Sequence, residues 1–291
     1  MFSEFRTFDV ERGEVRIHGR IGGSGPPLLL LHGHPQTHVM WHRVAGPLAA
    51  HHTVVAPDLR GYGDSTKPTG LDDHSNYSKR VMADDQVAVM RDMGFDRFRV
   101  CGHDRGGRVG HRMAIDHPAA VERLAVLDIA PTLAMYEKAD RAFATAYFHW
   151  FFLIQPPPLP ERLIESSPAD YITYTMGRRH ASLDRFDPAA IAAYQASLSR
   201  PGAAHGICED YRASNTIDLE HDRADREAGR RVGCPLLVLW AQHGAIDRFF
   251  DPLAEWRAVA DDVRGQPLAC GHYLPEEEPE AVVRHLLRFM G

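Results

Sequence analysis

Short, mostly apolar runs alternate with longer segments of helical periodicity over the first 133 residues of the chain. The runs predict strands at residues 28–31, 53–56, 98–101 and 121–127, and residues 14–19 alternate as a half-buried strand would. The longer segments predict helices, and they lie at residues 39–50, 77–93 and 109–117. Strands and helices in alternation favour an α/β fold with a mostly parallel sheet.

The character of the chain changes near residue 134, where aromatic and helix-forming residues begin to dominate. A proline-rich bend at residues 155–160 interrupts this helical segment. The later pattern predicts a strand, a helix, a weak strand and a final helix, at residues 235–240, 253–259, 266–269 and 278–290. We therefore expect a core domain formed by residues 1–133 and 217–291, into which residues 134–216 are inserted as a helical cap domain.

One predicted turn between a strand and a helix carries a distinctive sequence, Cys101-Gly102-His103-Asp104-Arg105-Gly106-Gly107-Arg108. Glycines flank the acidic residue Asp104, as in a nucleophile elbow, where a sharp strand–turn–helix lifts the central residue above the sheet. Small neighbours are needed because backbones approach closely at such a turn. An Asp nucleophile attacks carbon and forms an alkyl ester, which water then hydrolyses. Taken alone, the turn fits equally well a glycine-rich surface loop.

Two further polar residues follow predicted strands, in the chain order of nucleophile, acid and base. Asp128 follows the strand at 121–127, and His272 follows the last weak strand. Functional groups collect at the carboxyl ends of strands in an open α/β sheet. We therefore expect Asp104, Asp128 and His272 to form a catalytic triad. His272 would take a proton from water while Asp128 fixes its tautomer, and Asp247 is the alternative acid.

The loop after the strand at 28–31 provides a candidate for charge stabilisation. Its sequence is His32-Gly33-His34-Pro35-Gln36. A loop of this kind can place a backbone N–H opposite the elbow. The backbone N–H groups of His34 and Arg105 are therefore the candidate oxyanion donors.

Composition narrows the function classes. The 44% hydrophobic and 25% charged content is ordinary for a globular enzyme, and the net charge of −6 argues against nucleic-acid binding. The N-terminus shows no signal peptide, and no apolar stretch approaches the ~18 residues of a membrane span. Four widely spaced cysteines suggest free thiols in a reducing compartment. We therefore predict a cytoplasmic protein that binds neither nucleic acid nor membrane.

These motifs together resemble the α/β-hydrolase fold, through His32-Gly33, Asp58-Leu59-Arg60-Gly61-Tyr62-Gly63, the Asp104 elbow and Gly271-His272. More narrowly, the chain is similar to the fluoroacetate (haloacetate) dehalogenases over nearly its whole length. The narrower resemblance rests on four segments: Gly102-His103-Asp104-Arg105-Gly106-Gly107-Arg108, Val126-Leu127-Asp128-Ile129, His149-Trp150 and Cys208-Glu209-Asp210-Tyr211-Arg212-Ala213. It implies an eight-stranded, mostly parallel sheet with a helical cap, a homodimer, and catalysis without a metal or organic cofactor.

The resemblance also implies roles for two groups of residues. Arg105 and Arg108 share one face of a helix start and would hold the carboxylate of a small haloacid in forked hydrogen bonds. His149, Trp150 and Tyr211 match the halide pocket of the family and can donate hydrogen bonds to a departing halide. The implied reaction converts fluoroacetate or chloroacetate into glycolate and halide through an ester on Asp104.

Two departures and three alternatives remain. The family has Phe at the position of His34, and residues 174–183 match the family poorly, so substrate preference, pH dependence and substrate entry are open. An epoxide hydrolase would use the same triad with tyrosines from the cap, for which Tyr136, Tyr147 and Tyr211 are available. Haloalkane dehalogenases have Trp after the nucleophile, where this chain has Arg105. A binding protein that kept the fold is the non-enzymatic alternative.

Overall fold

The computed structural model describes residues 1–178 and 183–291 and contains one eight-stranded sheet in that part of the chain. The strands are β1 (Arg6–Arg12), β2 (Val15–Gly22), β3 (Pro27–Leu31), β4 (Thr53–Pro57), β5 (Phe98–His103), β6 (Val121–Leu127), β7 (Leu236–Ala241) and β8 (Val263–Leu268). Their order across the sheet is β1-β2-β4-β3-β5-β6-β7-β8. The pairs β1–β2 and β2–β4 are antiparallel, and every other pair is parallel. The predicted mostly parallel sheet is confirmed.

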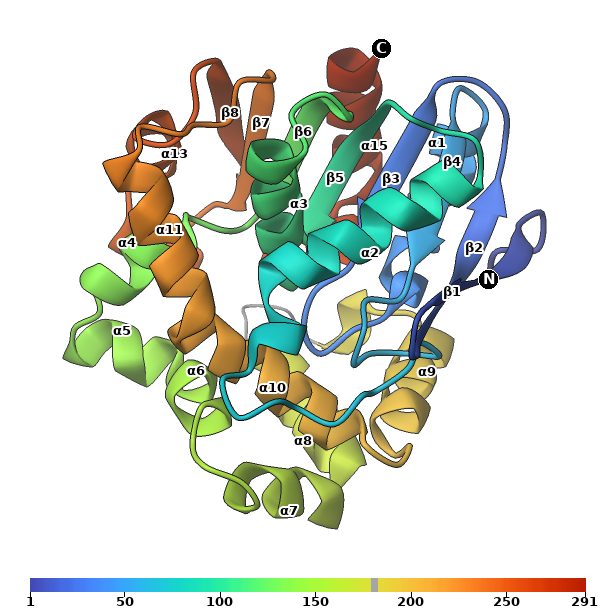
Figure 1. Cartoon of the computed structure of the whole chain (residues 1–291). Helices are drawn as coiled ribbons and strands as arrows, with labels where there is room; N and C mark the ends of the chain where they lie inside the picture. Colours follow the sequence, from blue (N-terminus) through green and yellow to red (C-terminus); the bar gives the residue numbers. More distant parts are fainter. Residues whose placement is uncertain (179–182) are drawn as a thin grey trace.

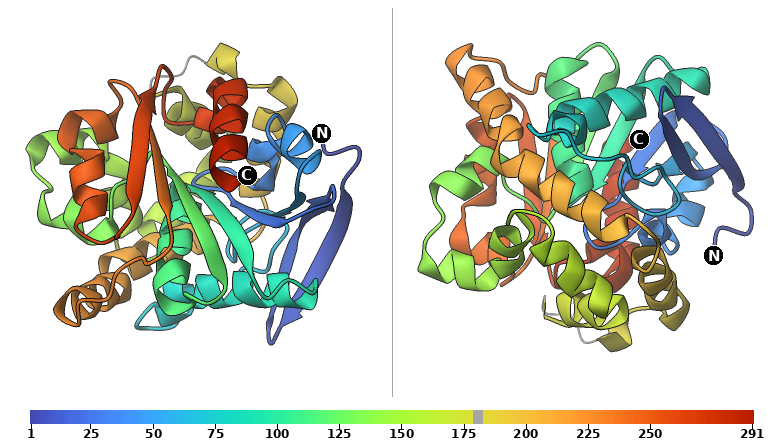
Figure 2. Two further views of the ribbon diagram at one scale, coloured as in Figure 1. Left: turned by 90° about the horizontal axis from the view of Figure 1, so that it is seen from above. Right: turned by 60° about the horizontal axis from the view of Figure 1, so that its bottom comes forward.

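Helices cover both faces of this sheet (Figures 1 and 2). On one face lie α1 (Ala45–Ala49) and α15 (Pro279–Met290), and on the other lie α2 (Lys79–Asp92) and α3 (Arg105–Asp116). Strands covered on both faces read as continuous apolar runs, and Leu28 to Leu31 in β3 are all fully buried. This double coverage explains why the central strands were visible in the sequence.

The described chain between β6 and β7 is helical. Its helices are α4 (Thr132–Glu137), α5 (Arg141–Ala146), α6 (Phe148–Leu153), α7 (Leu159–Ser166), α8 (Pro168–Gly177), α9 (Pro188–Leu198), α10 (Ala203–Asn215) and α11 (Ile217–Glu227), with the 3₁₀ turn η3 (Leu183–Arg185). Figure 1 shows α5 to α10 grouped below the sheet. The remaining short elements are η1 (His38–Trp41), η2 (Ser75–Tyr77), α12 (Ala245–Phe249), α13 (Pro252–Arg257) and α14 (Leu274–Glu277). No described helix is long and apolar enough to cross a membrane.

The structure differs from the prediction in two places. The single helix expected at 39–50 is divided into η1 and α1. Pro47 has no N–H with which to bond the carbonyl of Arg43, so a continuous helix would be broken there. Strand β1 was not predicted, because it is an edge strand in which Val10 is the only buried residue, and so it shows no apolar alternation.

Candidate active site

The site is built around the turn between β5 and α3. Asp104 occupies this turn with φ 46° and ψ −114°, a strained conformation for a residue with a side chain. Space at the turn is also restricted. A Cβ on Gly33 would lie 2.4 Å from the Cβ of Asp104, and one on Gly106 would lie 2.4 Å from the carbonyl oxygen of Leu31. The glycines therefore let β3, the turn and α3 approach closely enough to place one buried acidic side chain above the sheet.

The two oxygens of the Asp104 carboxylate face different groups. Oδ1 accepts a hydrogen bond of 2.9 Å from the backbone N–H of His34. Oδ2 lies 4.0 Å from Nε2 of His272. The neighbouring residue, Arg105, is the first residue of α3, and backbone N–H groups at a helix start are not used within the helix. The turn therefore offers an acidic side chain, a nearby imidazole and backbone donors within one small volume.

His272 is held on its other side by Asp128. Nδ1 of His272 lies 2.6 Å from Oδ2 of Asp128, whose Oδ1 accepts the backbone N–H of Ala241 at 2.9 Å. Asp128 directly follows β6, the neighbour of β5. The alternative acid, Asp247, instead accepts the indole N–H of Trp240 at 2.7 Å. This geometry lets Asp128 orient the imidazole with Nε2 toward Asp104.

Two residues that sequence reasoning missed fix the segment around His272. The carboxylate of Glu277 accepts the backbone N–H groups of Gly271 and Tyr273, at 2.7 and 2.9 Å. Nε2 of His103 lies 2.7 Å from the carbonyl oxygen of His272. Burial, followed by the nearby His272, lowers the pKa of His103 to about 3, so this ring is neutral and donates to that carbonyl. The position of His103 beside Asp104 was its only signal in the sequence.

Arg105 is held by a buried carboxylate. Its Nε and Nη2 donate to the two oxygens of Asp210 at 2.9 and 2.7 Å. The same carboxylate also accepts the Tyr62 hydroxyl at 2.6 Å and the ammonium group of Lys79. Burial opposes the charge on Arg105, but Asp210 outweighs it and raises the pKa of the guanidinium. Only Nη1 of Arg105 lacks a hydrogen-bond partner among the described residues, so the two N–H donors of this nitrogen remain for a ligand.

Arg108 has a different environment. Its Nη1 donates to the carbonyl of Ala130 at 3.1 Å and to Thr132 Oγ1 at 2.9 Å. Nη2 contacts the sulfur of Met135 at 3.1 Å. The described residues offer Arg108 no carboxylate within ion-pair distance, although its side chain is buried. Burial, and then the charge of Arg105, lower the pKa of this guanidinium. Such a buried cation fits an anionic ligand.

The three predicted halide donors lie beside these arginines. Arg105 stacks over the ring of Tyr211 at 4.1 Å and Arg108 over Trp150 at 4.8 Å. The ring centroids of His149 and Tyr211 are 5.9 Å apart, and those of Trp150 and Tyr211 are 6.4 Å apart. The indole N–H of Trp150 is buried and lacks a hydrogen-bond partner among residues 1–178 and 183–291. The structure therefore brings together the donors that the sequence placed on two separate segments.

His34 completes this cluster. Its side chain is fully buried, its ring lies 5.3 Å from that of Tyr211, and it is stacked with His149 at 6.1 Å. Nε2 of His34 is 3.1 Å from the hydroxyl of Tyr171, on α8. The residue that departs from the family pattern therefore contributes its backbone to Asp104 and its side chain to the donor cluster. Of the poorly matching segment 174–183, residues 179–182 lie outside the described residues.

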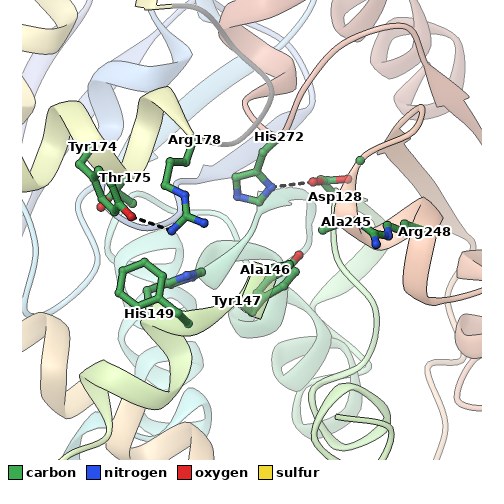
Figure 3. Close-up of a pocket in the computed structure, with 12 residues that line it drawn as sticks. Asp128, Ala146, Tyr147, His149, Tyr174, Thr175, Arg178, Ala245, Arg248 and His272 are labelled. Carbon is green, nitrogen blue, oxygen red and sulfur yellow. Dashed lines mark hydrogen bonds and ion pairs between the residues drawn. The ribbon is translucent and has the colours of Figure 1, made fainter. Parts of the chain in front are cut away.

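A pocket of about 220 Å³ reaches this site (Figure 3). Asp128 and His272 lie at one side of the pocket, and His149 lies across from them. Figure 3 also shows Arg178 pointing toward the space between these side chains, with its Nη1 2.8 Å from the Tyr174 hydroxyl. The described residues hold no cluster of three or more His, Cys, Asp or Glu side chains that could bind a metal ion.

Comparisons with known proteins agree with this fold. The sequence model of the α/β hydrolase fold family matches residues 26–279. The chain is 47% identical to a fluoroacetate dehalogenase from Burkholderia sp., an alignment that covers 100% of this chain and 95% of that protein. It is 36% identical to a soluble epoxide hydrolase from Corynebacterium sp. (strain C12), over 95% of this chain and 94% of that protein.

A solved structure is similar over the same extent. The crystal structure of a proposed α/β hydrolase from Nostoc sp. PCC 7120 superimposes with a TM-score of 0.97 and is 53% identical, covering 100% of this chain and 99% of that chain. The sheet order, the acidic elbow and the full-length similarity agree with one another. The chain is therefore a hydrolase of the α/β-hydrolase fold family and belongs, within it, to the family of the fluoroacetate dehalogenase.

Proposed function

We propose that this protein hydrolyses the carbon–halogen bond of small 2-haloacids such as fluoroacetate and chloroacetate. The products would be the 2-hydroxy acid, the halide ion and one proton. The proposal is supported by the 47% identity to a fluoroacetate dehalogenase. The single observation that carries it is the buried guanidinium of Arg108, which forms no ion pair with a carboxylate of the described chain. Burial and then the charge of Arg105 lower the pKa of this guanidinium more than the charge of Asp104 raises it. A substrate carboxylate would supply the ion-pair partner at the place where a haloacid must bind.

In the first half of the reaction, Asp104 displaces the halide. Arg108 and Nη1 of Arg105 hold the substrate carboxylate and present its α-carbon to the nucleophile, which is most of what an in-line displacement requires. Oδ2 of Asp104 forms a bond to that carbon as the carbon–halogen bond breaks, and the halide leaves with the bonding electrons. His149, Trp150 and Tyr211 donate hydrogen bonds to the halide and replace its hydration in the buried site.

In the second half, water hydrolyses the ester on Asp104. Nε2 of His272 takes a proton from water, and Asp128 stabilises the imidazolium that results. The hydroxide oxygen bonds to Cγ of Asp104, and negative charge develops on Oδ1, where the N–H groups of His34 and Arg105 would stabilise it. The intermediate releases the hydroxy acid, whose oxygen receives the proton from His272. Asp104 is left as a carboxylic acid, and it releases the product proton to become a carboxylate again.

Halide release tests this proposal directly. An ion-selective electrode would follow fluoride from fluoroacetate and chloride from chloroacetate for the wild type, Asp104→Asn, Asp128→Asn and the matched control Asp247→Asn. We expect turnover by the wild type and the control, and none by Asp104→Asn. Asp128→Asn should lose about four orders of magnitude in kcat, because the imidazole then adopts the wrong tautomer. Chloride release without fluoride release would contradict the fluoride pocket, and a control as inactive as Asp128→Asn would contradict the triad.

Epoxide hydrolysis is the second candidate, because the chain is 36% identical to an epoxide hydrolase. Such an enzyme needs phenols to protonate the opening ring, and the hydroxyl groups of Tyr136 and Tyr211 are buried near Trp150. Two guanidinium groups beside the nucleophile suit a carboxylate better than a neutral epoxide. A wild-type enzyme that opens epoxides but releases no halide from haloacids would reverse this choice.

The proposed organisation includes residues 134–216 as a cap over the core domain, contributing His149, Trp150 and Tyr211 to the site. This assignment is supported by the contact between Arg105, at the start of α3, and Asp210, on α10. The homodimer and the cytoplasmic location remain predictions from the sequence. Light scattering coupled to size exclusion should give a mass near twice the 32.6 kDa of the chain.

A further inference from the structure

A buried cluster beside the active site has no role in the mechanism above. It consists of Gln36, Tyr194 and Glu276, whose side chains are all fully buried. These residues come from three separate places, namely the loop after β3, helix α9 and helix α14. Buried polar residues from distant segments that bond to one another fix the relative positions of those segments.

The three side chains share hydrogen bonds. The hydroxyl of Tyr194 donates to Oε1 of Glu276 at 3.0 Å, and the side-chain amide of Gln36 contacts Oε2 of Glu276. Oε1 of Gln36 lacks a partner among the described residues. The nitrogen and oxygen of such an amide are assigned from hydrogen bonding. If the Gln36 amide is rotated so that the two atoms exchange places, its oxygen accepts a hydrogen bond from the O–H of a neutral Glu276 carboxyl. A protonated Glu276 would then donate a hydrogen bond to Gln36 while it accepts one from Tyr194.

The surroundings of Glu276 favour this neutral form. Burial is the largest influence and raises the pKa of Glu276 to about 8, with a further contribution from the Glu277 carboxylate. Hydrogen bonds from Tyr194 and Gln36 and the charge of Arg43 act in the opposite direction without reversing the shift. Arg43 donates to the backbone carbonyl of Glu276 at 2.6 Å, and Nδ1 of His42 lies 3.9 Å from Oε1. Burial lowers the pKa of His42, so that ring is also neutral.

The cluster is connected to the reacting groups on two sides. The backbone N–H of Gln36 donates to the carbonyl of Gly33 at 2.9 Å and closes the turn that contains His34. The N–H of His34 is the donor to Oδ1 of Asp104. Glu276 follows His272 by four residues, and its own N–H donates to the carbonyl of Tyr273 at 2.9 Å. Displacement of the Gln36 side chain would therefore move the donor for the developing oxyanion.

We propose that Glu276 is a positioning residue for ester hydrolysis: through Gln36 it holds the loop that carries the His34 N–H against Asp104. The inference rests on the proposed function, because it assigns the effect to the second half of that reaction. Halide departure does not need the oxyanion donor, whereas attack of water on the ester does. Loss of the carboxyl should therefore slow hydrolysis more than halide release.

Rapid-mixing measurements of halide release separate the two steps. For Glu276→Ala, we expect a burst of about one halide per active site followed by slow turnover, with kcat reduced roughly 10- to 100-fold, less than the loss of a whole oxyanion donor. Mass spectrometry of the quenched enzyme should show the ester on Asp104. Glu276→Gln, a neutral isostere with both a donor and an acceptor, should keep kcat within about threefold of the wild type.

A further variant keeps the test informative if Glu276→Ala is unstable. Gln36→Leu removes the link from the other side, and should reproduce the burst even if Glu276→Ala does not fold. The inference is overturned if well-folded Glu276→Ala or Gln36→Leu turns over like the wild type, shows no burst, or is no slower than Glu276→Gln. A wild type that releases no halide overturns the proposed function, and the inference with it, so the two failures are distinguishable.

Discussion

Arg105 and Arg108 lie three residues apart and are both buried, yet their surroundings give them opposite effects on stability. Arg105 neutralises Asp210 in a two-point ion pair within the protein. Arg108 bonds to a carbonyl, a hydroxyl and a sulfur, and it forms no ion pair within the described chain. A buried ion pair that loses one partner costs about 3–5 kcal/mol, because the other charge is left buried. A buried charge without a partner is itself destabilising.

Replacing each arginine by Met should separate these effects. We expect Arg105→Met to lower the free energy of unfolding by about 3 kcal/mol, because Asp210 would keep only Lys79 as a cationic partner. Arg108→Met should stay within roughly 1 kcal/mol of the wild type, because loss of a few hydrogen bonds is offset by loss of an unpaired charge. Both variants should lose most kcat/KM toward haloacetate. Urea unfolding measures the two free energies, and halide-release assays measure kcat/KM. Equal destabilisation of the two variants would contradict the expected difference between the arginines.

At the residue scale, the sequence predicted where the candidate triad residues lie, but it did not predict the partner that holds Arg105. Asp104, Asp128 and His272 could be located because each follows a strand or the elbow that presents it. The partner of Arg105 could not, because Asp210 is 105 positions away and the contact depends on how α10 packs against α3. Burial of Arg105 favours an acidic partner, but the sequence offers many acids and does not indicate which one packs against it.

At the scale of elements, close backbone approach explains the glycines of the elbow. A Cβ on Gly106 would meet the carbonyl oxygens of Leu31 and His32 at 2.4 and 2.5 Å, and neither backbone atom can rotate away. Helix α3 would have to move away from β3, and the Asp104 turn would move with it. Gly46, inside α1, provides a contrast, because a Cβ there would have nothing within 4 Å.

The pair Gly106→Ala and Gly46→Ala tests this packing. Gly106→Ala should lower the free energy of unfolding by about 1–3 kcal/mol, the usual cost of an overpacked site. Gly46→Ala should be neutral or stabilising by up to about 1 kcal/mol, because Ala is the better helix former. Urea denaturation of both variants gives the two values. Similar values for the two would mean that the β3–α3 contact is not limiting.

The same scale shows where pattern reading succeeds. Strands β3 to β7 are covered on both faces, so their apolar runs coincide with the predicted strands. The exposed edge strand β1 was invisible, and the division between η1 and α1 depends on one proline. Periodicity reports burial, and it gives little signal where an element buries few of its side chains.

At the scale of the whole molecule, Glu276 connects segments that are far apart in the chain. Gln36 and Glu276 are separated by 240 positions, and Tyr194 belongs to the helical segment between them. No spacing rule could have predicted this cluster, because it forms only when the loop after β3, α9 and α14 are all in place. Its carboxyl should also make the stability of the molecule depend on pH.

The sign follows from where the proton is held. Burial raises the pKa of Glu276 from its ordinary value of 4.5 to about 8 in the folded protein. Between pH 4.5 and pH 8 the unfolded chain loses the proton that the folded chain keeps. The contribution of Glu276 to the free energy of unfolding is therefore fully present below pH 4.5. It decreases as pH rises toward 8 and does not decrease further above that value. Each pH unit in this window corresponds to about 1.4 kcal/mol at most.

Glu276→Gln removes this contribution, because an amide does not titrate. Relative to the wild type, the variant should therefore gain about 2 kcal/mol in the free energy of unfolding between pH 5.5 and pH 7.5, somewhat less than the full linkage slope allows. Urea unfolding at the two pH values measures the gain, and Glu280→Gln, at an exposed position of α15, should show none. If the difference in free energy of unfolding between Glu276→Gln and the wild type stays constant with pH, the folded protein holds Glu276 ionised. Gln36 would then donate a hydrogen bond to Glu276 rather than accept one from it.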